Sequence, residues 1–245
     1  MAVSNNVLGI VLKTYALGEK DKILVLLTRE QGKFRVVAKG ARRPGGRFAA
    51  LEPLVEVQAA VHPGKNLHTL TQASIVTSHR RVREQLERLA YGLFMAELVD
   101  LFTVDKEVRP ENYDLLSRAL TRLEQDPPEK LLAYFATQLL RQMGLLPAWE
   151  NCCFCQREDK QLVALNLPEG GLLCAGCAKK IGGIPVEQET IFLLQYFAQV
   201  NWDGYRAIDG QAYSLKLSRL LEQFTFYQLS ARPRSYEFLN SMRQS

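Results

Sequence analysis

The 245-residue sequence lacks the segments that direct a protein into or across a membrane. Residues 1–6 contain no basic stretch followed by an apolar one, which is the pattern of a signal peptide. No apolar run approaches the roughly 20 residues that a membrane-spanning helix requires. We therefore expect a cytoplasmic protein without a membrane segment, in which cysteines stay reduced or bind a metal.

Motifs of catalysis are also missing. The sequence contains no Walker loop, no GxGxxG after a strand, no HExxH pair and no nucleophile elbow. Histidine is scarce, and the spacing of His62, His68 and His79 indicates neither a ligand set nor a catalytic pair. We expect these three to be ordinary surface or turn residues. The absences favour a protein that binds a partner over an enzyme.

Positive charge is concentrated in the first third of the chain. The net charge is only +5, but residues 1–83 hold 14 basic against 5 acidic residues, and residues 84–245 hold 17 against 21. A local positive field attracts polyanions whatever the total charge of the molecule. The distribution therefore predicts a polyanionic partner for the first segment.

The first eighty residues have the pattern of short β-strands. Runs rich in apolar and β-branched residues are separated by turn residues such as Gly18, Gly32 and the Pro63-Gly64 pair. Five short strands favour a small barrel, and the oligonucleotide-binding OB-fold is the commonest such architecture. We expect an OB-fold domain over residues 1–80. Its strands are predicted at residues 7–14, 22–28, 32–39, 54–62 and 67–77.

From residue 81 onward the apolar residues follow helical spacing. They recur three or four positions apart between residues 86 and 101, which predicts one buried stripe along a helix. Glu97 falls inside this stripe, and we expect it to lie at the edge or to pair with a basic residue. Further helices are predicted after Arg109, after Asp126, and over residues 187–200 and 213–229, with a short element at 236–242.

Two CxxC pairs are the strongest local signal. Cys152 and Cys155 form one pair, and Cys174 and Cys177 form the other after eighteen intervening residues. Zn²⁺ accepts four thiolates tetrahedrally, and four protein ligands leave no open position for water or substrate. Cys153 is expected to be a free thiol outside the shell, and the alternative for the other four is a set of buried, reduced cysteines without metal.

The sequence therefore predicts a multi-domain α+β protein. An all-α domain over residues 81–245 follows the barrel and contains an inserted segment, 149–180, that holds one structural Zn²⁺. Four thiolates around Zn²⁺ leave a formal charge of about −2. Nearby cations are expected to offset this charge in preference to binding phosphate: Arg157, Lys160, Lys179 and Lys180.

The predicted strand at residues 32–39 carries alternating cations. The alternation directs Lys33 and Arg35 to one side and Phe34 to the other, so Phe34 is expected to pack in the core and not to stack on a base. The loop that follows holds three arginines and no acidic residue before Glu52, as a flexible phosphate clamp would. The predicted DNA-binding residues are Lys33, Arg35, Lys39, Arg42, Arg43, Arg47, Arg80 and Arg81.

Two interpretations of this basic segment remain open. A run of charge can simply be a solvated face, although its place on a barrel and the cluster at Arg80 and Arg81 favour nucleic-acid binding. Phe48, at the end of the loop, could stack on a base or could anchor the loop to the barrel.

The run Gly40-Ala-Arg-Arg-Pro, followed by Arg47-Phe48, resembles the basic signature of RecO recombination mediators. The order of the parts is also similar to that of zinc-bearing RecO proteins: an OB-like domain, a helical domain, a CxxC...CxxC insertion and a basic carboxy-terminal stretch. The resemblance covers nearly the whole chain.

The resemblance implies a bacterial, nucleoid-associated protein without enzymatic activity. It would bind single- and double-stranded DNA, anneal complementary strands, and act with RecR to load RecA on DNA coated by single-strand-binding protein, whose C-terminal tail would bind the helical domain. The alternative is a zinc-ribbon adaptor or transcription-associated protein whose barrel binds RNA or a protein partner. A nuclease is disfavoured because a closed thiolate shell offers no catalytic metal position.

Overall fold

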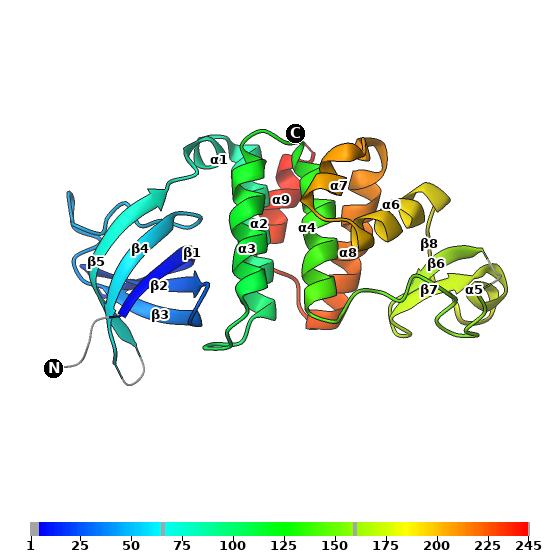
Figure 1. Ribbon diagram of the computed structural model, residues 1–245, viewed down its shortest axis with the longest axis horizontal. Helices are drawn as coiled ribbons and strands as arrows, with labels where there is room; N and C mark the ends of the chain where they lie inside the picture. The colour runs from blue at the N-terminus through cyan, green and yellow to red at the C-terminus, as the bar shows by residue number, and fades with distance from the viewer. Residues whose placement is uncertain (1–4, 65–66, 159–160, 245) are drawn as a thin grey trace. The chain divides into compact units, whose positions relative to one another are not determined.

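The computed structural model describes residues 5–64, 67–158 and 161–244 (Figure 1). Contacts divide the chain into two compact units. The first unit comprises the residues up to Asp126 together with those from Pro233 onward, and the second comprises Pro127–Arg232. Among the described helices, none combines the length and the apolar character that crossing a membrane requires.

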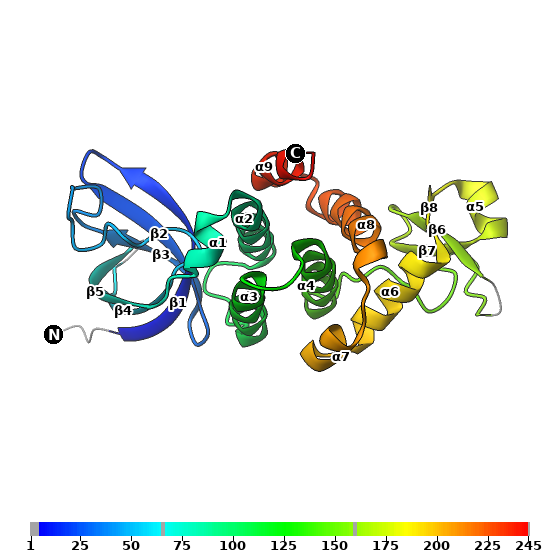
Figure 2. The ribbon, with the colours of Figure 1, turned by 90° about the horizontal axis from the view of Figure 1, so that it is seen from above.

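The first unit begins with a closed five-stranded barrel, in the strand order β1-β2-β3-β5-β4 (Figure 2). β3 and β5 pair in parallel, and the other neighbours are antiparallel. The predicted five-stranded barrel is therefore confirmed. Its strands are β1 (Asn5–Leu17), β2 (Asp21–Thr28), β3 (Gly32–Ala38), β4 (Glu56–His62) and β5 (His68–Thr77).

Alternation along β3 separates the barrel core from its outer side. Phe34, Val36 and Ala38 are buried in the core, whereas Arg35 is exposed. Phe34 therefore packs as predicted. Phe48 is also in the core, where it is 5% exposed, so it anchors the loop that precedes it and is not available to stack on a base.

Among its described residues, the first unit also contains four helices: α1 (Arg80–Glu84), α2 (Leu86–Phe102), α3 (Pro110–Leu123) and α9 (Ser235–Met242). α2 packs against α3, α9 and β1. The side chain of Glu97, on α2, accepts hydrogen bonds from the backbone N–H groups of Arg234 and Ser235 and so satisfies donors at the start of α9. Glu97 is thus paired, but with backbone and hydroxyl donors instead of a basic side chain.

His79 differs from its prediction as a surface or turn residue. It does lie in a turn, between β5 and α1, with a left-handed φ of 44°. However, it is only 2% exposed, and its Nδ1 lies 3.8 Å from the Glu124 carboxylate. Burial lowers the pKa of its imidazole, against the opposing effect of Glu124 and Glu56. The sequence spacing could not show that a neighbouring helix covers this turn.

The second unit is a helical core with a small sheet. Pro128 occupies the first turn of α4, and all residues from 131 to 140 are buried. α4 packs against α6 and α8, as expected for helices with apolar stripes. The elements are α4 (Pro128–Gln142), β6 (Leu162–Asn166), β7 (Gly171–Cys174), α5 (Ala175–Ile181), β8 (Ile184–Pro185), α6 (Gln188–Gln199), α7 (Trp202–Ala207) and α8 (Gln211–Leu229).

The division into units does not follow the change in secondary structure. Strands give way to helices at Arg80, where the sequence predicts the domain boundary, but the first compact unit continues to Asp126. The reason is that α2 and α3 pack on the strands β1 and β2. The residues predicted as one all-α domain are therefore shared between the two units.

Candidate metal centre and nucleic-acid interface

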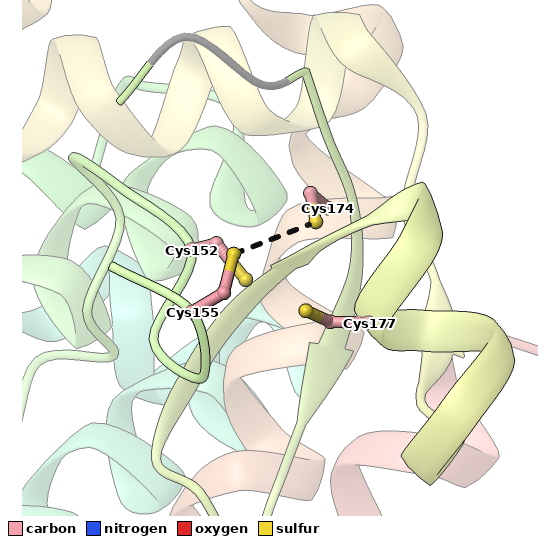
Figure 3. Close-up of side chains that lie close together, drawn as sticks. All are labelled: Cys152, Cys155, Cys174 and Cys177. Atoms are coloured by element: carbon pink, nitrogen blue, oxygen red, sulfur yellow. Dashed lines mark hydrogen bonds between the residues drawn. The ribbon is translucent and has the colours of Figure 1, made fainter. Parts of the chain in front are cut away.

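The four predicted ligand cysteines converge on one point. The sulfur atoms of Cys152, Cys155, Cys174 and Cys177 all lie within 4.8 Å of one another (Figure 3). The Sγ atoms of Cys155 and Cys174 are 3.9 Å apart. Tetrahedral Zn²⁺ with Zn–S bonds of about 2.3 Å would hold its sulfurs roughly 3.8 Å apart. The cluster therefore has the donors and the spacing that a tetrahedral metal ion requires.

Backbone hydrogen bonds shape the two knuckles. The Gln156 N–H donates to the Cys152 carbonyl at 2.8 Å, and the Cys153 N–H donates to the Leu172 carbonyl at 2.9 Å, which ties the first knuckle to β7. β7 ends at Cys174, which is the N-cap of α5, and Cys177 follows in the first turn of that helix. A strand, a turn and a helix start thus position the four thiols.

The thiols of the cluster differ in acidity. Burial raises the pKa of the Cys152 thiol, but hydrogen bonds from the backbone of Cys155, Cys174 and Phe154 lower it to about 6. Burial and the neighbouring cysteines raise the pKa of Cys177 to about 12. Four thiolates cannot coexist at this distance without a compensating positive charge, which a divalent metal supplies.

Cys153 and the nearby cations occupy different positions around the cluster. Cys153 lies outside the group of four, and burial, followed by the charge of Cys152, raises its pKa to about 11. Arg157 and Lys180 line a cavity of about 600 Å³ that also borders Cys155, Cys174 and Cys177. Lys179 is exposed, and Lys160 lies outside the described residues.

The loop between β3 and β4 carries an exposed group of cations, which we call the arginine loop (residues 39–48). Its N–H···O=C bonds include Arg43 to Gly40 at 3.1 Å and Gly46 to Arg43 at 2.8 Å. Its exposed cations, Lys39, Arg42, Arg43 and Arg47, make no ion pair with any described residue.

A neighbouring turn adds a cation that the sequence interpretation missed. The Arg42 N–H donates to the Lys20 carbonyl at 3.0 Å, and the Arg42 guanidinium donates to the Gly18 carbonyl. Lys20 is exposed and belongs to the turn between β1 and β2. The only sequence signal for it was the glycine turn that joins two predicted strands.

Lys33 and Arg35, also predicted to contact DNA, have acidic partners. The Lys33 Nζ lies 3.0 Å from Asp100 Oδ1 and 3.6 Å from Asp105 Oδ1, and the residue is 6% exposed. Arg35 pairs with Asp105 as well, and Lys13 pairs with Asp100. The outward side of β3 at Lys33 is therefore covered by α2 and the segment after it. This corrects the expectation that Lys33 lies on the exposed basic face, because strand alternation cannot show what covers a strand.

Asp100 is the centre of this ion network. It is 7% exposed, and burial alone would raise its pKa. Hydrogen bonds and charge from Lys13 and Lys33 outweigh that effect and hold the carboxyl pKa below 3.8. The network joins β1 and β3 to α2 within the first unit.

Arg80 and Arg81 lie on a different element from the arginine loop. Both are exposed on α1, which packs against α2, and the Arg80 Nε lies 2.6 Å from Glu84. No described contact joins them to residues 39–48. Lys39, Arg42, Arg43 and Arg47 thus share one exposed loop, and the two α1 arginines lie on a separate element.

Comparison with known proteins identifies both parts of the chain. The family model described as Recombination protein O N terminal matches residues 1–79, and the one described as Recombination protein O C terminal matches residues 83–237. The division between them agrees with the change from strands to helices at Arg80.

Curated proteins named DNA repair protein RecO are similar over most of their length. The protein of Symbiobacterium thermophilum is 36% identical, with 98% of both chains covered. That of Moorella thermoacetica is 30% identical over 96% of this chain and 90% of its own. That of Bacillus subtilis is 34% identical over 77% of this chain and 75% of its own.

None of these names denotes an enzyme, in agreement with the sequence prediction. The two family models together match most of the sequence, and full-length relatives exceed 30% identity. This chain therefore belongs to the RecO family of DNA repair and recombination proteins.

Proposed function

We propose that this RecO family protein binds single- and double-stranded DNA through the arginine loop of its barrel and anneals complementary strands. The observation that carries the proposal is the separation of the barrel's cations into two sets. Lys33 and Arg35 are neutralised by Asp100 and Asp105, whereas the loop cations are exposed and without a described acidic partner. Cations of the second kind are available to phosphate.

The proposed mechanism requires no covalent step. Guanidinium groups bind phosphate oxygens in a planar, bidentate manner, and each phosphate that is neutralised releases condensed counterions. Two strands held by such contacts repel each other less, and the pairing of their bases supplies the driving force for annealing. Nucleotide hydrolysis is not needed for these steps.

We further propose that the protein acts with RecR to load RecA on DNA coated by single-strand-binding protein, and that it binds the C-terminal tail of that protein. The support is the family resemblance and the names of the relatives, which denote DNA repair. A protein of this kind would work in the cytoplasm, in association with the nucleoid. Arg80 and Arg81 stay candidates for additional DNA contacts because both are exposed.

We propose that the four-cysteine cluster holds one structural Zn²⁺. The four sulfurs lie within 4.8 Å of one another, and all four are needed to complete a tetrahedral shell. A complete shell leaves no position for a reacting water. The metal would therefore stabilise the segment around β6 and β7 and would take no part in chemistry.

Replacing Arg42, Arg43 and Arg47 together by alanine should weaken binding to single-stranded DNA about 100-fold at 0.1 M salt. The loss of three phosphate contacts with a single strand lowers the slope of log K against log salt by about 2. Because this electrostatic contribution vanishes near 1 M salt, a slope change of about 2 corresponds to about a 100-fold loss of affinity at 0.1 M, one decade lower. Fluorescence anisotropy with a labelled oligonucleotide across a salt series measures both quantities.

The matched control removes the same charge from helices. Arg118, Arg206 and Arg219 are exposed, and their joint replacement by alanine should leave the slope nearly unchanged. If both triple variants lose affinity equally, binding depends on the net charge and not on the loop. If the loop variant binds like the original protein, the loop is not the DNA-binding site.

A further inference from the structure

The outer wall of the barrel has a hollow beside the arginine loop. Its volume is about 480 Å³, and it lies across β1, β4 and β5. No carboxylate is among its described lining residues. We call it the amide trough, and its principal lining residues are Asn6, Arg47, Gln58, Ala60, Gln72 and Ser74.

The strand register explains why the hollow exists. Ala60 of β4 lies opposite Asn6 of β1 on one side and opposite Gln72 of β5 on the other. Two residues away along each of β4 and β5, and on the same face of the sheet, Gln58 lies opposite Ser74. Residues directly opposite each other, and those two apart on one strand, share a face of the sheet. A methyl group therefore forms the floor, and longer polar side chains form the walls.

The polar groups of the trough are not used by the fold. Asn6, Gln58, Gln72 and Ser74 are exposed, and none makes a side-chain hydrogen bond to another described residue. A side-chain amide offers two donors and one acceptor oxygen. The trough thus presents several unengaged donors and acceptors without net charge, apart from the guanidinium of Arg47.

A bulge adds to the shape of the trough. The β4–β5 ladder changes register between Ala60 and Val61. The hydroxyl of Thr71 donates to the Ala60 carbonyl at 2.9 Å and satisfies it at this irregular position. Bulges redirect side chains and bend the strand locally. Here the bulge lies at the floor residue.

Arg47 joins the trough to the arginine loop. Its guanidinium carbon lies 5.4 Å from the centre of the Phe48 ring, and Phe48 is buried in the barrel core. The cation–π contact holds the guanidinium against the barrel wall. Arg47 therefore belongs both to the cations that we propose for phosphate and to the lining of the hollow.

We propose that the amide trough receives unpaired bases of a single DNA strand whose phosphate binds Arg47. This inference rests on the proposed DNA-binding function, and it adds that the site distinguishes single-stranded DNA from duplex DNA. Asparagine and glutamine amides pair with the donor and acceptor edges of bases. A base that is stacked and paired inside a duplex cannot enter a hollow on the protein surface, whereas a splayed base of a single strand can.

The test compares three DNA probes on one double variant, Gln58→Ala with Gln72→Ala. The probes are a single strand of about 16 nucleotides, the upper site size for one such barrel, an abasic strand of equal length, and a duplex of equal length. We expect the affinity for the ordinary single strand to fall about fivefold or more, the lower end for losing a base contact. Binding of the abasic strand and the duplex, and the salt slope, should be unchanged.

A second variant and a control keep the result unambiguous. Ala60→Leu fills the floor with an aliphatic side chain, which offers no ring for a base to stack on, and should cause the same selective loss without removing a polar group. The double variant Gln125→Ala with Gln199→Ala removes two exposed glutamines elsewhere and should bind all three probes normally. Far-UV circular dichroism of each variant checks that the fold is retained.

The outcomes separate this inference from the function on which it rests. If the original protein binds none of the three probes, the proposed DNA-binding function fails. If it binds them but the trough variants bind the ordinary strand normally, or lose the abasic strand equally, only the base-binding trough is overturned. If the trough binds a peptide instead of bases, the trough variants would bind the ordinary strand normally.

Discussion

Replacing Cys174 by serine is expected to abolish the binding of one zinc ion per chain and to unfold the small sheet around β6 and β7. Structural Zn²⁺ contributes about 10–16 kcal/mol of apparent binding free energy, which is comparable to the whole stability of an ordinary domain, about 5–15 kcal/mol. Metal analysis by mass spectrometry measures the zinc, and tryptophan fluorescence measures the unfolding. Both tryptophans of the sequence, Trp149 and Trp202, belong to the second unit.

The matched control for this substitution is Cys153→Ser. Cys153 is adjacent to a ligand in sequence but lies outside the four-sulfur cluster, so the variant should retain one zinc ion and its fluorescence. Hydrogen exchange in the barrel strands, which belong to the first unit, should be unchanged in both variants. Stoichiometric zinc in purified Cys174→Ser protein would contradict the assignment of this cysteine as a ligand.

The variant Asp100→Asn is expected to destabilise the first unit by about 3 kcal/mol at neutral pH. Removing one partner of a buried ion pair leaves an uncompensated charge and typically costs about 3–5 kcal/mol. We expect the lower end because Asp105 Oδ1 lies 3.6 Å from the same Lys33 ammonium. Urea dependence of hydrogen exchange in β3 and α2, followed by mass spectrometry, measures the change in the free energy of unfolding.

The control for Asp100 is an exposed ion pair in the same unit. Asp114 pairs with Arg29, and both side chains are about half exposed, so solvent screens the pair and Asp114→Asn should destabilise the unit much less than Asp100→Asn. Equal losses of unfolding free energy in the two variants would show that the buried Asp100 network adds no more stability than an exposed ion pair does.

The Asp100 contribution should also depend on pH in a defined direction. Because the folded-state pKa of this carboxyl is lowered, its stabilisation is present above the usual value of 3.8 and is lost as the pH falls through the folded-state pKa. The difference in stability between the original protein and Asp100→Asn should therefore shrink in acid.

Much of the barrel was predictable because its information is local. Two-residue alternation and glycine turns located all five strands, and alternation in β3 assigned Phe34 to the core. Three helices of the second unit, α4, α6 and α8, followed from apolar spacing and, for α4, from a proline in its first turn, whereas the shorter α5 and α7 were not predicted. The four-cysteine cluster was predictable for the same reason, since each CxxC knuckle is a local motif with a fixed geometry.

Features that depend on tertiary contacts were not predictable. Lys33 has the alternation of an exposed residue, and only the packing of α2 on the barrel places Asp100 next to it. His79 is buried for a similar reason. The strands β6, β7 and β8 were missed because they are only two to five residues long, which is too short for a hydrophobic period to show in the sequence. The amide trough requires the cross-strand register of Ala60, which no single segment contains.

The return of α9 to α2 has a consequence for how the protein is made. Glu97 caps a helix that begins at Ser235, and every residue of the second unit lies between them in the chain. A ribosome therefore releases the barrel and α2 long before the segment that closes their unit exists. During that interval the face of α2 that α9 will cover stays open, and a nascent chain halted before Ser235 would keep it open permanently.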